Sequence, residues 1–294
     1  MANLRDVRLR MRAIRQTLQV TRAMNLISTA KLRTGRRILE DTVPFFTRIE
    51  KSMFDILSGA GHLNSKFLTA YEKEDVSRTA ILVITSDKGL AGGYNASVFR
   101  HVEELAARVK NPVLILIGTI GYRHFSHSPL LILENFSFKS RLPGMDDARE
   151  IAEYIVSQYL WGVFEEVHLV YTHMYSSIKL LPRERQILPL SKEKMQKEFE
   201  KAGGKRMELQ FEYWPSKIVL FEYLVPLYVK GIIYGSLIEA YVSEQSARMT
   251  AMDQASKNAK EMLDGLQIQY NRVRQAGITQ EMTEIAGGAE ALNN

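Results

Sequence analysis

The chain has 294 residues, of which 46% are hydrophobic and 24% charged, a balance typical of a globular protein. It has no cysteine, so disulfides, thiolate zinc sites and a cysteine nucleophile are excluded. The net charge is +6. No apolar run approaches the roughly 20 residues of a membrane span, and residues 1–40 show no secretory cleavage pattern.

The N-terminal segment is predicted to form one long helix over residues 3–43. Its apolar residues alternate at spacings of three and four, the pattern of a coiled-coil seam: Leu4, Val7, Met11, Ile14 and Leu18. Residues 1–37 contain ten basic side chains and one acidic residue, Asp6. Five arginines form a stripe beside the seam: Arg5, Arg8, Arg12, Arg15 and Arg22. This one-sided charge favours an acidic partner surface, nucleic acid or an anionic membrane face over an ordinary solvated face.

The middle of the chain alternates between apolar runs and amphipathic segments. Buried strands are expected at residues 79–85, 112–118, 130–136 and 167–173, with helices at 96–110, 119–126 and 146–161 between them. This alternation predicts an α/β unit with a mainly parallel sheet. Edge strands are expected at 177–190 and 207–214, separated by a charged helix or loop over 191–205.

The glycine-rich stretch TSDKGLAGGYN, residues 85–95, lies between a predicted strand and a predicted helix, where many proteins bind nucleotide phosphates. Its chemistry argues against such a site. Lys88 precedes the glycines instead of following them, and no acidic residue stands about 20 positions on to bind a ribose. We therefore expect a tight turn in which glycine supplies positive φ and Asn95 caps the next helix.

The C-terminal segment mirrors the first one. No proline occurs between Leu227 and about Ile285, and a second seam is predicted at Met252, Ala255, Ala259, Met262, Leu266, Tyr270 and Val273. If the two terminal helices pair, they must be antiparallel, because one enters and the other leaves the same middle unit. The C-terminal helix is longer by about 20 residues, so its end is expected to lack a partner helix.

Several blocks of the sequence together resemble the gamma subunit of the rotary ATP synthase. The C-terminal block ITQEMTEIAGGAEA (278–291) fits that family's pattern in full, and SEQSARMTAMDQASKNA (243–259) is close to another of its blocks. TRAMNLISTAKLR (21–33) and TSDKGLAGGYN also resemble family segments. The resemblance implies a long antiparallel coiled coil plus a central Rossmann-like α/β domain without a nucleotide site. The implied segments are 1–60 for the first helix, 76–213 for the central domain and 216–294 for the last helix.

In function, the resemblance implies the central shaft of the complex, itself non-catalytic and without a cofactor or metal. Ion flow turns the membrane c ring and the shaft, and the shaft drives the surrounding alpha and beta subunits through their conformations in turn. The implied partners are the alpha, beta and epsilon subunits and the c ring, with one copy of this chain per complex. The implied location is peripheral, on the cytoplasmic face of a bacterial cell membrane, with no direct insertion.

The resemblance also implies which residues contact these partners. Contacts to the alpha/beta ring are implied for residues in three matched blocks: Met24, Glu244, Arg248, Arg274, Gln275 and Thr279. In the segment before the final helix, Trp214 stands where the family often has an acid. Glu212 is the candidate substitute, so Glu212, Tyr213 and Trp214 form the implied contact to the c ring and epsilon subunit.

Two other functions remain as alternatives. A basic coiled coil could bind nucleic acid, but no aromatic residue interrupts the basic stripe before Phe45, which disfavours base stacking. An enzyme is less favoured, because the six histidines are scattered. The close pair His124 and His127 has no clustered carboxylates or cysteines nearby to complete a metal site.

Overall fold

The computed structural model describes residues 4–59, 64–68, 78–138, 141–176, 179–191, 214 and 216–292. The chain divides into two compact units. We call residues 1–29 and 248–294 the helix-pair unit, and residues 30–247 the α/β unit. Helices α1 (Leu4–Gly59) and α6 (Lys217–Leu292) each contribute to both units. Each unit is described by itself below.

Both terminal helices are longer than their sequence pattern predicts. The expected N-terminal helix ends at residue 43, but α1 continues through Pro44 to Gly59, and α6 starts before Pro226 instead of after it. Proline removes a backbone hydrogen bond from a helix interior and costs about 3 kcal/mol. Burial compensates for it here: Met53 and Ile56 follow Pro44 and are 0% and 1% exposed, and Phe221 and Val225 precede Pro226 and are 0% exposed.

A five-stranded sheet forms the centre of the α/β unit, in the order β3-β2-β1-β4-β5. The first four strands are β1 (Thr79–Ile84), β2 (Pro112–Ile117), β3 (Leu131–Phe136) and β4 (Glu166–Met174), and they pair in parallel. The edge strand β5 (Leu180–Leu188) is antiparallel to β4. The expected mainly parallel sheet is confirmed, and so is an edge strand within 177–190. Of the strand expected at 207–214 and the charged segment expected at 191–205, only Trp214 and Ser191 are among the described residues, so neither expectation is tested.

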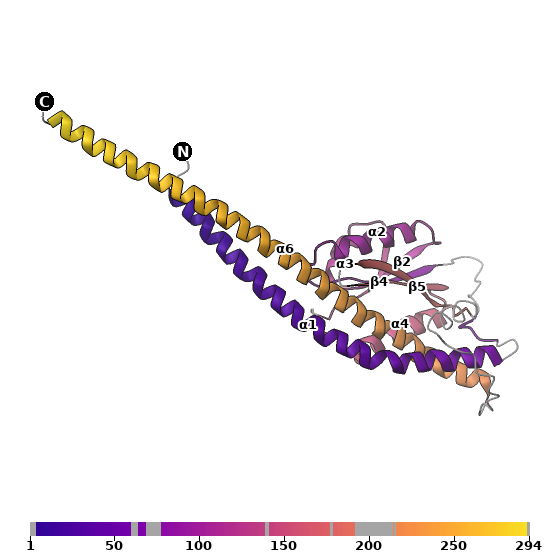
Figure 1. The fold of residues 1–294 in the computed structure, drawn as a ribbon. Coiled ribbons are helices and arrows are strands. Elements are labelled where there is room, and N and C mark those ends of the chain that lie inside the picture. The colour runs from indigo at the N-terminus through magenta and orange to yellow at the C-terminus, as the bar shows by residue number, and fades with distance from the viewer. Residues whose placement is uncertain are drawn as a thin grey trace. The chain divides into compact units, whose positions relative to one another are not determined.

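Helices cover both faces of this sheet (Figure 1). On one face, α2 (Tyr94–Ala106) and α3 (Thr119–Phe125) bury Val98, Val102 and Phe125 against β1 and β2. On the other face lie α4 (Met145–Leu160) and the α/β-unit segments of α1 and α6. Because both faces are covered, β1 is buried at every position, which explains its uninterrupted apolar run TAILVI.

The segments of α1 and α6 in the α/β unit are antiparallel and approach closely where one of them has a glycine. A Cβ at Gly35 would lie 2.8 Å from Val242 Cγ2, and a Cβ at Gly231 would overlap the ring of Phe46. From Gly35 to Phe46 the residue number rises along α1, while from Val242 to Gly231 it falls along α6, so the two segments are antiparallel. Close backbone approach of this kind offsets the loss of about 1 kcal/mol that glycine causes in a helix.

By length and composition alone, α6 contains an 18-residue stretch apolar enough to cross a membrane, a test that core helices of soluble proteins also pass. The sequence-based expectation that no apolar run reaches this length was therefore wrong for α6. In the α/β unit, Val229, Ile233 and Ile238 of this helix are 0% exposed. Packing inside the protein thus accounts for its apolar character.

Candidate partner-contact surface

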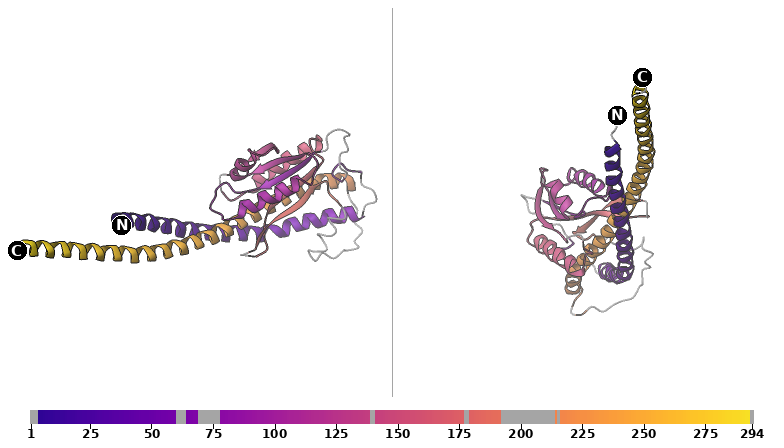
Figure 2. Two further views of the ribbon diagram at one scale, coloured as in Figure 1. Left: turned by 90° about the horizontal axis from the view of Figure 1, so that it is seen from above. Right: turned by 90° about the vertical axis from the view of Figure 1, so that its left-hand side faces the viewer.

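In the helix-pair unit, α1 and α6 lie side by side along a continuous seam (Figures 1 and 2). The α1 seam is as predicted: Val7 and Met11 are buried, and Leu4, Ile14 and Leu18 are half-buried. On α6, Met252 and Ala259 are buried and Ala255, Leu266, Tyr270 and Val273 are half-buried. Met262 was wrongly placed in this seam, because it is 59% exposed and Leu263 takes the inner position. Both positions satisfy three-and-four spacing, so the pattern could not separate them.

Side-chain hydrogen bonds join the two helices of this unit. Arg8 Nη2 donates to Tyr270 Oη at 2.9 Å, Ser256 Oγ donates to Thr21 Oγ1 at 2.8 Å, and Asn25 Nδ2 donates to the carbonyl of Met249 at 3.0 Å. The α1 number rises as the α6 number falls, so the helices are antiparallel, as predicted. These polar contacts lock the register of a seam that contains small residues.

The Arg8 contact changes the acidity of Tyr270. The hydrogen bond from Arg8 lowers the pKa of Tyr270 below its ordinary value of 10.0, and the charges of Arg8 and Arg274 act in the same direction. The folded chain therefore holds this proton less tightly than the unfolded chain. The associated stability is fully present above about pH 10 and is lost as the pH falls through the folded-state pKa of Tyr270.

We expect this shift to be measurable by ultraviolet titration of tyrosine ionisation. Subtracting the titration of Tyr270→Phe from that of the unaltered chain isolates one phenol, whose pKa should lie below 10.0. In the Arg8→Ala background the same subtraction should give a pKa closer to the ordinary value, because the hydrogen bond and the charge of Arg8 are gone while the charge of Arg274 remains. An unchanged pKa in that background would show that Arg8 does not control Tyr270.

The predicted basic stripe is solvent-exposed along its whole length. Its five members are all exposed: Arg5, Arg8, Arg12, Arg15 and Arg22. Beside its end, a groove of about 390 Å³ is lined by Arg22, Asn25, Leu26, Asp253, Ser256, Lys257 and Lys260. Asp253 binds Lys257 at 2.8 Å and raises its pKa, chiefly through that hydrogen bond. Lys257 and Lys260 extend the cationic surface onto α6, which the sequence analysis did not anticipate because it followed the charges of one helix only.

The structure places the implied ring contacts in three different environments. Met24 is half-buried on α1 in the helix-pair unit. Arg248 is 8% exposed, which differs from the surface position that an ordinary partner contact would have. Glu244 belongs to the α/β unit, where it is half-buried and lines a small cleft beside Thr85 and Asp87. Motif position alone could not distinguish these three environments.

Arg274, Gln275 and Thr279 lie on the part of α6 that has no α1 segment beside it. Every described side chain from Arg274 to Gly288 is exposed, and Thr279 donates only to the carbonyl of Gln275 in its own helix, at 3.0 Å. The expected unpartnered end is confirmed within the helix-pair unit. It carries an apolar stripe at helical spacing, Ile278, Met282 and Ile285, which are 50%, 66% and 73% exposed. An apolar stripe that no described residue of the helix-pair unit covers marks a surface for another molecule.

The implied c-ring and epsilon contact is only partly described. Trp214 is 90% exposed, whereas Glu212 and Tyr213 lie outside the described residues. On α6 nearby in sequence, Val219 and Tyr223 are 50% and 75% exposed. Large apolar side chains on a helix surface are a second candidate contact that the sequence analysis did not name.

The glycine-rich turn after β1 is held by side-chain hydrogen bonds. Asp87 Oδ1 accepts from the backbone N–H and the hydroxyl of Thr119 at 3.0 and 3.1 Å, and from Ser137 Oγ at 3.0 Å. This carboxylate thus links the loops that follow β1, β2 and β3. Nucleotide phosphates would need backbone donors at this edge of the sheet, and an acidic side chain occupies the position instead.

Two details of this turn differ from the prediction. Asn95 does not cap α2: the N-cap is Gly93, and the Asn95 side chain turns back to bind the backbone N–H of Ser86 at 3.1 Å and its hydroxyl at 2.7 Å. Positive φ occurs at Gly92, as expected, but also at Leu90, with φ of 64°. The sequence places the turn correctly but cannot assign each backbone conformation within it.

Gly118, which follows β2, is the glycine whose backbone conformation matters most at this edge. Its φ is +101°, and a Cβ there would meet the carbonyl oxygen and the hydroxyl of Thr85. We expect Gly118→Ala to lower the free energy of unfolding by about 1–3 kcal/mol. Urea denaturation measures it, with Gly89→Ala as the control, because nothing lies within 4 Å of a Cβ at Gly89. Equal stability of both variants would contradict the strained position.

Comparisons with known proteins agree on one family. A family model described as ATP synthase matches residues 3–292. The ATP synthase gamma chain of Acetivibrio thermocellus is 40% identical over 296 residues, covering 99% of this chain and 100% of the relative. The sodium-ion-specific gamma chain of Acetobacterium woodii is 38% identical over 303 residues, covering 99% of both chains.

Solved structures share the fold. A chain in the Euglena gracilis mitochondrial ATP synthase, in a structure of its OSCP, F1 and c-ring, aligns with a TM-score of 0.67 at 18% identity, covering 98% of this chain and 94% of that one. A chain in the central stalk and c-ring structure of the Tetrahymena thermophila enzyme aligns with a TM-score of 0.59 at 23% identity, covering 81% and 99%. The mixed α/β architecture with two long terminal helices is therefore shared with them.

Proposed function

This chain belongs to the ATP synthase gamma chain family, and from that premise we propose that it is the central rotor shaft of an F-type ATP synthase. The subunit is non-catalytic. It couples ion-driven rotation of the membrane c ring to conformational changes in the catalytic alpha/beta ring. The alternative of a nucleic-acid-binding coiled coil has no support among the relatives, which are gamma chains of this enzyme.

The observation that carries the mechanical part of the proposal is the helix-pair unit. A seam of half-buried and buried residues, with cross-helix hydrogen bonds, resists twisting of one helix about the other. A pair of helices transmits torque only if the two helices do not slide along each other. Hydrogen bonds between polar side chains of α1 and α6 oppose such sliding, because they form at one register only. The basic stripe then faces outward, available to acidic side chains of a surrounding ring.

We propose that the alpha/beta ring contacts two regions. Around Met24 the groove lined by Arg22, Lys257 and Lys260 supplies cationic contacts. At the unpartnered end, Arg274, Gln275 and Thr279 supply polar contacts, and the apolar stripe of Ile278, Met282 and Ile285 fits a nonpolar sleeve. Arginine binds carboxylates through two parallel hydrogen bonds, which suits the acidic partner that the stripe predicts.

Arg248 and Glu244 take a different role from that of a freely accessible contact. Because Arg248 is 8% exposed and Glu244 is half-buried, we propose that they hold the shape of α6 near the ring-facing surface. The segment containing Glu212, Tyr213 and Trp214 contacts the c ring and the epsilon subunit in this proposal, with one copy of the chain per complex. Residues 1–60, 76–213 and 216–294 remain the proposed domain segments.

Gamma subunits are peripheral components of a membrane-bound complex, and we propose the cytoplasmic face of a bacterial cell membrane as the location of this one. Affinity purification of a tagged chain from native membranes tests the assignment. The alpha, beta and epsilon subunits and the c ring should co-purify with the tagged chain. These subunits should stay bound at high salt, because salt does not weaken the apolar contacts. Recovery of nucleic acid without these subunits, released by raising the salt concentration, would support the alternative instead.

A further inference from the structure

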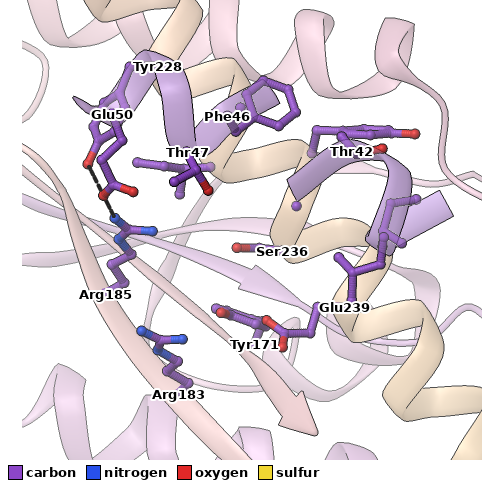
Figure 3. Close-up of a pocket in the computed structure, with 16 residues that line it drawn as sticks. Thr42, Phe46, Thr47, Glu50, Tyr171, Arg183, Arg185, Tyr228, Ser236 and Glu239 are labelled. Carbon is purple, nitrogen blue, oxygen red and sulfur yellow. Dashed lines mark hydrogen bonds and ion pairs between the residues drawn. The ribbon is translucent and has the colours of Figure 1, made fainter. Parts of the chain in front are cut away.

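A cavity of about 320 Å³ lies within the α/β unit, between α1, β4, β5 and α6 (Figure 3). Its size is at the lower end of the range for small-molecule sites, about 300–1,000 Å³. Its walls combine apolar side chains, including Leu39, Phe46, Ile232 and Ile238, with charged and hydroxyl groups. None of the residues named above as partner contacts lines it.

A glycine on α6 keeps this cavity open. Gly231 and Gly235 both line it, one helical turn apart, but they differ in what surrounds them. A Cβ at Gly231 would overlap the Phe46 ring, so helix packing requires that glycine. At Gly235 nothing lies within 4 Å of a Cβ, so packing does not require it. The missing side chain leaves open space at a cost of about 1 kcal/mol in helix stability relative to alanine.

The charged groups of the cavity are unevenly compensated. Arg183 and Arg185 are two residues apart on β5 and therefore project from the same face of the strand. Arg185 Nη2 binds Glu50 Oε1 at 3.0 Å and Tyr228 Oη at 3.2 Å. Within the part of the chain that the structure describes, no acidic side chain lies within ion-pair distance of Arg183, which is half-buried. One guanidinium in the cavity thus has unused hydrogen-bond donors.

The other carboxylate of the cavity is already engaged. Glu239 Oε1 lies 2.5 Å from His173 Nδ1, and Glu239 also accepts a hydrogen bond from Tyr171. Burial, and then the charge of Glu239, raise the pKa of Tyr171 well above its ordinary value, while Arg183 acts in the opposite direction. The Tyr171 hydroxyl therefore stays protonated. Among the described residues, Arg183 is the arginine of the cavity that has no carboxylate within ion-pair distance.

We propose that this cavity binds a small organic anion with an apolar body. The carboxylate of the ligand would accept two parallel hydrogen bonds from the guanidinium of Arg183, whose donors match carboxylate geometry. Its body would fill the space beside Gly235, between Phe46 and Ile232. Such a ligand contacts α1, β5 and α6 at once, so its binding stabilises the folded α/β unit by mass action.

Isothermal titration of the full-length chain with 2-naphthoate tests this proposal, with 2-naphthalenemethanol as a neutral analogue of similar shape. We expect saturable one-to-one binding of the naphthoate, at least about tenfold tighter than that of the alcohol. Arg183→Gln should weaken naphthoate binding by about tenfold or more and leave the alcohol unaffected. Gly235→Leu should abolish binding of both compounds, because the new side chain occupies the cavity.

The matched control is Arg100→Gln, which removes one positive charge from an arginine whose side chain is 77% exposed on α2. It should bind naphthoate as the unaltered chain does, and circular dichroism should show that all three variants keep their helices. The proposal is overturned if millimolar naphthoate does not bind. It is equally overturned if the alcohol binds as tightly, or if Arg183→Gln and Gly235→Leu leave binding unchanged.

Discussion

Removing residues 275–294 should lower coupled ATP synthesis by the assembled complex about tenfold or more, whereas removing residues 287–294 should leave it within about twofold of the intact level. The longer deletion takes away Gln275, Thr279 and the exposed stripe of Ile278, Met282 and Ile285. The shorter deletion removes GGAEALNN, which lies beyond that stripe and has one large apolar residue, Leu292. Synthesis in membrane vesicles, normalised to assembled complex, is the measurement.

Folding of the truncated chains serves as the control. Because every described side chain from Arg274 to Gly288 is exposed, neither deletion should expose a core residue or change thermal unfolding of the rest of the chain. A loss of synthesis already at the shorter truncation would show that the last eight residues are themselves essential. Full coupling after the longer truncation would show that the proposed contact between the unpartnered end of α6 and the alpha/beta ring does not exist.

Arg248→Ala is the single substitution from which we expect the largest combined effect. Arg248 is 8% exposed, so truncating its side chain removes buried packing and should cost about 1–3 kcal/mol of unfolding free energy. It should also lower coupling, because α6 changes shape near its ring-facing surface. Urea denaturation of the isolated chain and ATP-driven proton or sodium pumping by vesicles measure the two effects.

Arg274→Ala is the matched comparison, since Arg274 is exposed on the same helix. It should leave stability within about 0.5 kcal/mol and still reduce coupling. The pair therefore separates a residue that shapes the helix from one that touches the partner. If Arg248→Ala were as stable as the unaltered chain, its low exposure would carry no energetic weight and a direct contact role would gain support.

Much of the fold could be predicted from the sequence, because the apolar runs of the strands differ clearly from the three-and-four spacing of the long helices. Each of the four parallel strands was expected to within one residue at either end. The clearest are β1 and β2, which are buried almost throughout and read as unbroken apolar runs. The α1 seam was also predicted residue by residue. The helix ends read from the apolar pattern, residue 43 and the start after Pro226, differ from the structure. Proline marks a helix end locally, but tertiary packing carries both helices past their prolines.

The candidate contact residues rest on motif position, and motif position does not give the environment of a side chain. Motif position indicated Glu244 and Arg248 as well as Arg274 and Gln275, yet burial separates the first two from the second two. Sequence spacing also could not choose Leu263 over Met262 for the α6 seam. The Arg183 cavity left no pattern at all, because it depends on side chains from four elements that meet only after folding.

Observation of rotation in single complexes tests the central claim most directly. The chain has no cysteine, so Ala107→Cys, at an exposed position after α2, gives it a single thiol for attaching a bead. With the alpha/beta ring fixed to a surface, ATP should turn the bead continuously in one direction. ATP hydrolysis at the normal rate with a stationary bead would contradict the account of this chain as the rotor.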